Sequence, residues 1–142
     1  MVVAMNRERG VFMSPQTVAA LNMYEGVVTS SFTQINQSDQ HQMVRVLLEG
    51  AVRRIRESVA ALSLNDFEKK SIHVTKAQKI IFGLRRTLDF EKGGEIAMNL
   101  DSLYDYCIRT LTSAHCTNDR KKFAEAQGIL EDLLSGWKEI KK

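Results

Sequence analysis

Residues 93–119 carry apolar side chains three and four residues apart, which is the period of one face of an α-helix. A glycine pair, Gly93 and Gly94, precedes this stretch and frees the backbone to turn. Asn118 and Asp119 follow it and are typical of a helix start. The positions of this face are Ile96, Leu100, Leu103, Cys107, Thr110, Leu111 and Ala114, all of them apolar except Thr110. The pattern therefore predicts one long amphipathic helix with a marked boundary at each end.

Three further stretches repeat this spacing and predict three more helices. The first begins at an N-cap residue, Asp39, and runs to about Leu62, and it contains Gly50, where a neighbouring helix is expected to approach closely. The second begins at Ser63 or Asn65 and runs to about Asp89, with residues 90–94 as a short connector, and the last spans about residues 119–140. The residues along their inward faces are Val44, Leu47, Ala51, Ile55, Leu62, Phe67, Val74, Ala77, Ile81, Leu84, Leu88, Phe123, Ala126, Leu130, Leu133, Trp137 and Ile140, and Ser58 continues the spacing of the first helix.

Composition favours an all-α fold for this chain. The single proline is Pro15, so no proline breaks the predicted helices, and aromatic residues make up only 7% of the 142 residues. Long helices with short connections predict an antiparallel up-down four-helix bundle over residues 39–142. Residues 1–38 are expected to form a leader, a short helix from Pro15 to Tyr24, and a polar strap at 27–38, within one domain overall.

Charge and cysteine content exclude several classes of partner. The net charge is only +3, and the basic residues are spread along the chain beside acids, so no nucleic acid is expected. Cys107 and Cys116 would lie about 13 Å apart along one helix, too far for a disulfide, which fits a reducing compartment. No apolar stretch is long enough for a signal peptide or a membrane span. We therefore expect a cytosolic protein without membrane insertion.

The sequence has no pattern typical of catalysis, metal binding or cofactor binding. No glutamate is followed three residues later by histidine, as a di-iron bundle requires, and Gly93-Gly94 lacks the lysine of a phosphate-binding loop. We therefore expect no enzyme, no metal and no cofactor. The alternative function is a histidine phosphotransfer or other signalling bundle, with His73 or His115 as the phosphorylated residue. Such modules tend to show lysine and glycine after the histidine, whereas His73 is followed by Lys76 without the glycine and His115 by neither.

Additional apolar residues lie beside the predicted helix seams. A four-helix core wider than two positions per heptad would bury them, whereas a groove between helices would present them to an amphipathic partner. A third possibility is self-association, as a monomer in equilibrium with a weak homodimer. The candidate groove residues are Leu48, Val52, Ile80, Tyr104 and Ile108.

Several motifs resemble the flagellar export chaperone FliS family. The sequence LYDYCIRTL at 103–111 is similar to the pattern in the family's third helix, and VLLEGA at 46–51 and KAQKII at 76–81 resemble its earlier helices. WKEI at 137–140 resembles the family's closing motif, and Tyr24 stands where the family has a tyrosine before its strap. Asp39 in place of a Ser/Thr-Pro cap, Leu48 in place of an aromatic residue, and His115 in place of Asn depart from the pattern.

The resemblance implies a chaperone that binds the disordered C-terminal segment of flagellin in the bacterial cytosol. Such a protein prevents premature polymerisation and delivers flagellin to the export gate of the flagellar type III apparatus, and a co-chaperone could bind its opposite face. The five candidate groove residues would contact flagellin, while Tyr24, Phe32 and Ile35 would form the strap and gate contacts. On this hypothesis Tyr104→Ala or Ile80→Asp weakens flagellin binding while the fold survives.

Overall fold

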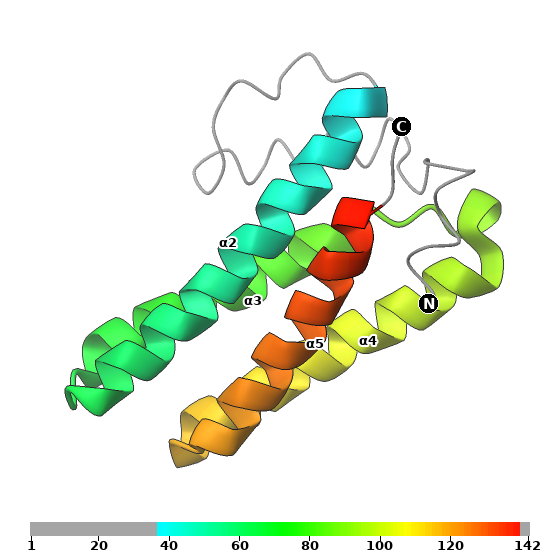
Figure 1. The fold of residues 1–142 in the computed structure, drawn as a ribbon. Helices are drawn as coiled ribbons and strands as arrows, with labels where there is room; N and C mark the ends of the chain where they lie inside the picture. The colour runs from blue at the N-terminus through cyan, green and yellow to red at the C-terminus, as the bar shows by residue number, and fades with distance from the viewer. Residues whose placement is uncertain (1–36, 140–142) are drawn as a thin grey trace.

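Four long helices make up the part of the chain that the structure, a computed structural model, describes, residues 37–139 (Figure 1). They are α2 (Gln37–Ser63), α3 (Phe67–Arg86), α4 (Phe90–Thr117) and α5 (Arg120–Glu139). The all-α prediction is confirmed. The leader, the short helix at 15–24, strap residues 27–36 and Ile140 lie outside the described residues, and α2 begins at Gln37, inside the predicted strap.

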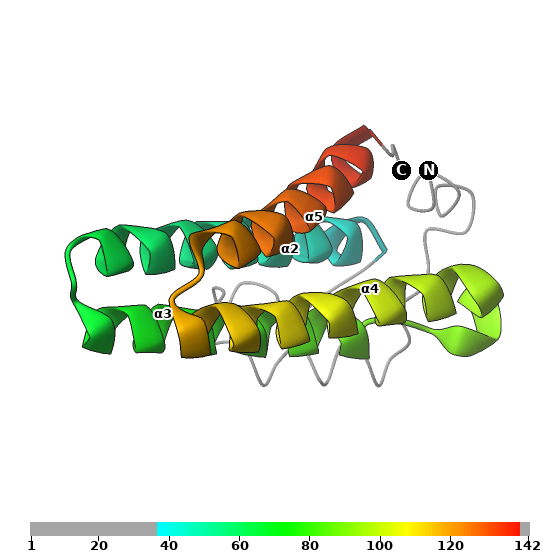
Figure 2. The ribbon, with the colours of Figure 1, turned by 90° about the horizontal axis from the view of Figure 1, so that it is seen from below.

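The helices run alternately up and down and form an antiparallel bundle (Figure 2). Each helix packs on the helices before and after it, and α2 packs on α5, which closes the ring. The Trp137 indole stacks on the His41 ring, with centroids 4.7 Å apart, and its Nε1 donates to the His41 carbonyl at 2.9 Å. This contact fixes the end of α5 against the start of α2.

The core is wider than the predicted seams. Most seam positions are buried, but Phe67 is 50% exposed, and Ile96 and Leu103 are only partly buried. The prediction of a buried Phe67 was wrong because the residue opens α3, where its side chain reaches the bundle end. The core additionally buries Met43, Leu48, Val52, Ile80, Ala97 and Tyr104.

Aspartates cap three of the four helices. Asp66, and not Ser63 or Asn65, caps α3 by accepting from the Lys69 backbone N–H at 3.1 Å. Asn65 instead has φ 57°, a left-handed conformation that asparagine tolerates at the end of α2. Asp119 accepts from the Lys121 and Lys122 N–H groups at 2.9 and 3.4 Å and caps α5, as predicted.

The predicted connector at residues 90–94 is wrong. Helix α3 ends at Arg86. Asp89 accepts from the Glu91 and Lys92 N–H groups and caps α4, which therefore begins at Phe90. The helix is interrupted at Gly94, whose φ of 52° and ψ of −128° leave helical geometry in a conformation suited to glycine. Gly94 therefore kinks α4 near its start.

Gly50 marks the close approach of α2 and α3 that its position inside a helix predicts. A Cβ atom on Gly50 would lie 3.5 Å from Ile80 Cδ1. Ile80 therefore packs directly against the α2 backbone.

Candidate partner-binding site

The candidate groove residues come from three helices, Leu48 and Val52 from α2, Ile80 from α3, and Tyr104 and Ile108 from α4. Four of them are buried in the hydrophobic core, and Ile108 alone is partly exposed while packing against that core. They share one cluster but do not line an open groove. A partner could touch Ile108 directly and would reach the other four only through a rearrangement.

Tyr104 differs from the other buried groove residues because it carries a polar group. The residue is 4% exposed, and burial followed by the nearby Cys107 raises the pKa of its phenol. Its hydroxyl makes no hydrogen bond to any residue between 37 and 139. The neighbouring Cys107 thiol is also buried, which raises its pKa to about 12, so it is a poor nucleophile.

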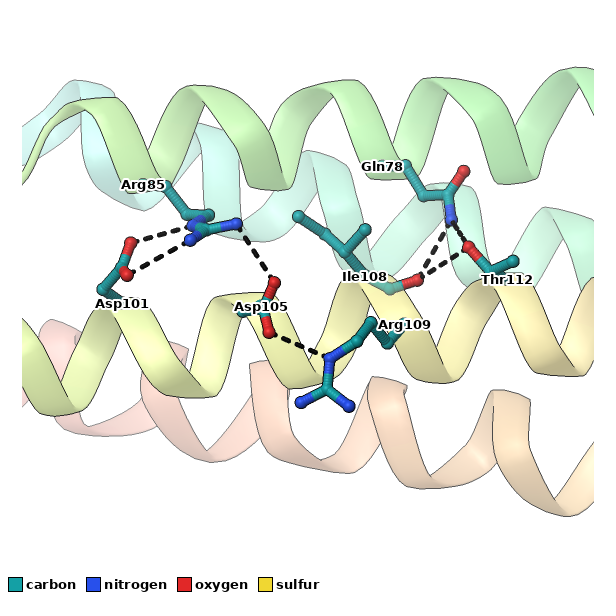
Figure 3. Close-up of polar contacts among 7 residues, drawn as sticks. All are labelled: Gln78, Arg85, Asp101, Asp105, Ile108, Arg109 and Thr112. Atoms are coloured by element: carbon teal, nitrogen blue, oxygen red, sulfur yellow. Dashed lines mark hydrogen bonds and ion pairs between the residues drawn. The ribbon is translucent and has the colours of Figure 1, made fainter.

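Polar contacts between α3 and α4 surround Ile108 (Figure 3). The Gln78 side chain on α3 donates to the Ile108 carbonyl at 3.1 Å and to the Thr112 hydroxyl at 2.8 Å. The Thr112 hydroxyl donates in turn to the same carbonyl at 3.1 Å. These bonds hold α3 and α4 together beside the one groove residue that solvent reaches.

A guanidinium–carboxylate network extends this contact along the same two helices. Arg85 on α3 bonds both oxygens of Asp101, at 2.8 and 3.1 Å, and reaches Asp105 at 3.3 Å (Figure 3). The hydrogen bond to Asp101 is the main cause that raises the pKa of Arg85. Arg109 Nε donates to the other Asp105 oxygen at 2.9 Å. Because the pairs are partly exposed, solvent screens them, and they orient the helices more than they stabilise the fold.

Sequence reasoning did not identify this network. Asp105 and Arg109 are four residues apart, a spacing that predicts a pair on one helix. The contacts of Arg85 and Gln78 with α4 depend on how the two helices are aligned, which no spacing within one helix reveals.

The two histidines of the alternative signalling function are both partly buried at helix contacts. The His73 Nδ1 atom lies 3.0 Å from an Arg54 guanidinium nitrogen and 3.4 Å from Glu57. His115 lies beside Lys70, and its Nδ1 is buried. Phosphoryl transfer needs a ring nitrogen that a donor can approach, and these contacts obstruct the Nδ1 atom of both rings.

Lys70 is a buried cation that closes the far end of α4. It is 4% exposed, and its Nζ donates to the His115 carbonyl at 3.1 Å and to the Asn118 side-chain oxygen. It also lies 5.5 Å from the Phe67 ring centroid. A positive charge at a helix C-terminus is stabilising because it meets unpaired carbonyl groups.

We expect Lys70→Met to raise the pKa of His115. In the folded protein this pKa lies below its ordinary value of 6.5, first because of burial and second because of the Lys70 charge. Removing the charge leaves the burial, so the pKa rises part of the way, as an NMR titration of the ring would measure. Between pH 6.5 and the lowered pKa of the folded protein, this ring binds more protons in the unfolded chain, so the wild type loses stability as the pH falls through this window. The variant has a narrower window and should lose less stability.

The exposed neighbour Lys69 provides the control for this measurement. Lys69→Met removes the same charge one residue away and should leave the His115 titration unchanged. An identical pKa in the wild type and in Lys70→Met would show that the lysine does not influence the ring.

Within residues 37–139, no helix is long and apolar enough to cross a membrane. The same residues contain no group of three or more His, Cys, Asp or Glu side chains placed to hold a metal ion.

Comparisons with known proteins match almost the whole chain. The family model described as flagellar protein FliS matches residues 23–142. The flagellar secretion chaperone FliSB of Pseudomonas aeruginosa is 36% identical over 118 residues, which cover 83% of this chain and 92% of the relative. The flagellar secretion chaperone FliS of Salmonella typhimurium is 36% identical over 87% of this chain and 91% of its own length. The FliS chaperone of Bacillus subtilis is 30% identical over 74% of this chain and 77% of its own.

Proposed function

Because the chain belongs to the FliS family of flagellar proteins, we propose that it is a flagellar export chaperone whose client is flagellin. It binds the disordered C-terminal segment of flagellin, prevents premature polymerisation and delivers the client to the flagellar type III export gate. The observation that carries the proposal is the family match over residues 23–142, which includes all four helices of the bundle. The protein acts in the bacterial cytosol, as a monomer or weak homodimer, by binding rather than by chemistry.

Partly buried apolar side chains support binding of an amphipathic segment. Besides Ile108, they occur on α2, α4 and α5, at Val59, Ile96, Leu103, Ile129 and Leu134. A segment that folds as it binds can cover such scattered positions, and its ordering lowers the affinity, which favours release at the gate. On this proposal Ile108 is the first contact, and Leu48, Val52, Ile80 and Tyr104 join it as the helices adjust.

Two further contacts are proposed, one through residues that precede the bundle and one through the bundle face opposite the client. Tyr24, Phe32 and Ile35 serve as the strap and gate contacts, and all three lie outside the described residues. The face opposite the client remains available for a co-chaperone.

Isothermal titration with a synthetic C-terminal flagellin segment from the same organism tests the proposal. We expect one-to-one binding at micromolar or tighter Kd, with a strongly negative heat-capacity change from apolar burial. A scrambled segment of equal composition should give no saturable heat. If the native segment gives no heat at any temperature, the client is not flagellin.

A pair of matched variants locates the contact. Ile108→Thr and Ile129→Thr make the same change at two partly buried positions on different helices, so their stability costs should be similar. Loss of an apolar contact at Ile108 should weaken flagellin binding about tenfold, which corresponds to about 1.4 kcal/mol. Wild-type affinity in both variants would place the client elsewhere on the bundle, and equal weakening in both would show that the segment also covers Ile129.

A further inference from the structure

Helix α3 carries more positive charge than the whole chain. The chain has a net charge of +3, whereas α3 contains one acid, Glu68, and six cations. The cations are Lys69, Lys70, Lys76, Lys79, Arg85 and Arg86. Lys70 and Arg85 are occupied by their contacts with α4. The other four are therefore the source of the excess charge on the outer face.

These four cations are exposed, and none forms an ion pair with a residue between 37 and 139. Arg54, Arg56, Arg85 and Arg109, by contrast, all lie within ion-pair distance of a carboxylate. Lys76 and Lys79 are three residues apart, so their charges repel each other on the same side of the helix. This arrangement does not help the helix to fold.

Two large apolar residues are exposed on the same outer face of α3. Ile72 is 45% exposed and Phe82 is 46% exposed. They are separated by about 15 Å along the helix axis, with Lys76 and Lys79 between them. We call the face that the six residues form, at spacings of three and four, the α3 stripe: Lys69, Ile72, Lys76, Lys79, Phe82 and Arg86.

We infer that the α3 stripe is a docking surface for an acidic amphipathic helix of a second protein. Carboxylates of that helix pair with the unpaired lysines and Arg86, and two apolar side chains, three turns apart, cover Ile72 and Phe82. Charge complementarity selects the partner, and the apolar contacts at both ends fix its alignment. The inference is independent of the proposed client, because Ile108 lies on α4 and the buried groove residues face the core.

The same residues are less suited to other classes of partner. A nucleic acid needs faces on which bases stack, and Phe82 is the single aromatic residue of the stripe. A membrane surface needs a continuous apolar face, whereas the apolar face of α3 is buried in the bundle, and its exposed large apolar residues, Phe67, Ile72 and Phe82, are separated along the helix. A hollow of about 220 Å³ adjoins Lys69, and it is lined by Ala60, Ala61 and Leu64 together with the polar residues Glu57, Asp66 and His73.

The test uses the full chain and a designed probe peptide. The probe is a capped acidic helix of about 18 residues, long enough to cover the stripe, with two leucines three turns apart and glutamates on the same face. Fluorescence anisotropy at physiological salt measures its binding. A scrambled peptide of equal composition keeps the charge but loses the alignment, and it should bind at least tenfold more weakly.

Three double variants identify the surface. Lys76→Glu with Lys79→Glu, and separately Ile72→Ser with Phe82→Ser, should each weaken the probe at least tenfold while helicity is unchanged. Arg53→Glu with Lys121→Glu makes the same charge change at exposed positions on α2 and α5 and should leave the affinity within about twofold.

The inference is overturned if the scrambled peptide binds as tightly as the probe, because the attraction is then nonspecific charge. It is overturned equally if a single-stranded RNA or vesicles containing anionic lipid bind the stripe more tightly than the probe. Sedimentation that shows a dimer abolished by Lys76→Glu with Lys79→Glu would assign the stripe to a second copy of the chain instead.

Discussion

Replacing Ile80 by aspartate should unfold the bundle at room temperature. Ile80 is 0% exposed and packs against the α2 backbone at Gly50. The substitution removes a core side chain, which costs about 2–5 kcal/mol, and buries a carboxyl group without a partner, which costs several kcal/mol more. The sum approaches the entire stability of a domain of this size, about 5–15 kcal/mol. Far-UV circular dichroism during urea and thermal unfolding measures the loss.

The neighbouring Lys79 gives the matched control. Lys79→Asp introduces the same side chain one residue away, on the exposed face, and should change stability by less than about 0.5 kcal/mol. Ile80→Val, which keeps the position apolar, should cost only about 0.5–1.5 kcal/mol. An Ile80→Asp protein with wild-type melting behaviour would mean that this position is open to a partner, as the sequence pattern had suggested.

The sequence pattern makes Ile80 a candidate groove residue, whereas the structure places it in the core. The two differ because the core is wider than the apolar face of any one helix. Spacing within each helix identifies Val44, Leu47 and Ile81 as interior, and they are buried. A two-position seam leaves Ile80, Leu48 and their neighbours at its margin. Whether a margin position is buried depends on two flanking helices rather than on one. Periodicity alone therefore predicts the bundle but cannot separate core from groove.

Helix ends were predicted only in part, because several residues near each end can serve as a cap. Asp66 and Asn65 are both good cap residues, and the chain uses the aspartate for α3 and the left-handed asparagine to end α2. The glycine pair indicates a turn, but a single residue, Gly94, absorbs it within α4. Where neighbouring residues could each cap or end a helix, the packing of that helix in the bundle determines which of them does so.

The polar contacts of the candidate site could not be predicted from the sequence. Lys70 follows Lys69, and two adjacent lysines suggest a solvated surface. The C-terminal end of α4 nevertheless covers Lys70 and provides oxygen atoms that accept its hydrogen bonds. The α3 stripe shows the opposite case, since its charge is visible in the sequence but the absence of ion pairs depends on the helices around it. Contacts between helices thus decide which charges are available to a partner.

Tyr104→Ala and Tyr104→Phe should have very different effects on stability. Alanine leaves a cavity in the core and should cost about 3–5 kcal/mol, close to the cost of removing a buried aromatic ring. Phenylalanine keeps the ring and breaks no hydrogen bond to residues 37–139, so the free energy of unfolding should stay within about 0.5 kcal/mol. Urea unfolding of both variants measures the contrast.

The same pair of variants separates a structural role for Tyr104 from contact with the client. If Tyr104 joins the contact with flagellin through its hydroxyl, Tyr104→Phe weakens binding about threefold to tenfold without loss of stability. Tyr106, also on α4, has an exposed hydroxyl that donates to Glu125 on α5 at 2.5 Å, and Tyr106→Phe should leave flagellin affinity unchanged. Calorimetry measures the affinity. Wild-type affinity in Tyr104→Phe would show that the hydroxyl does not contact the client, because Tyr104 would then contribute only through the packing of its ring in the core.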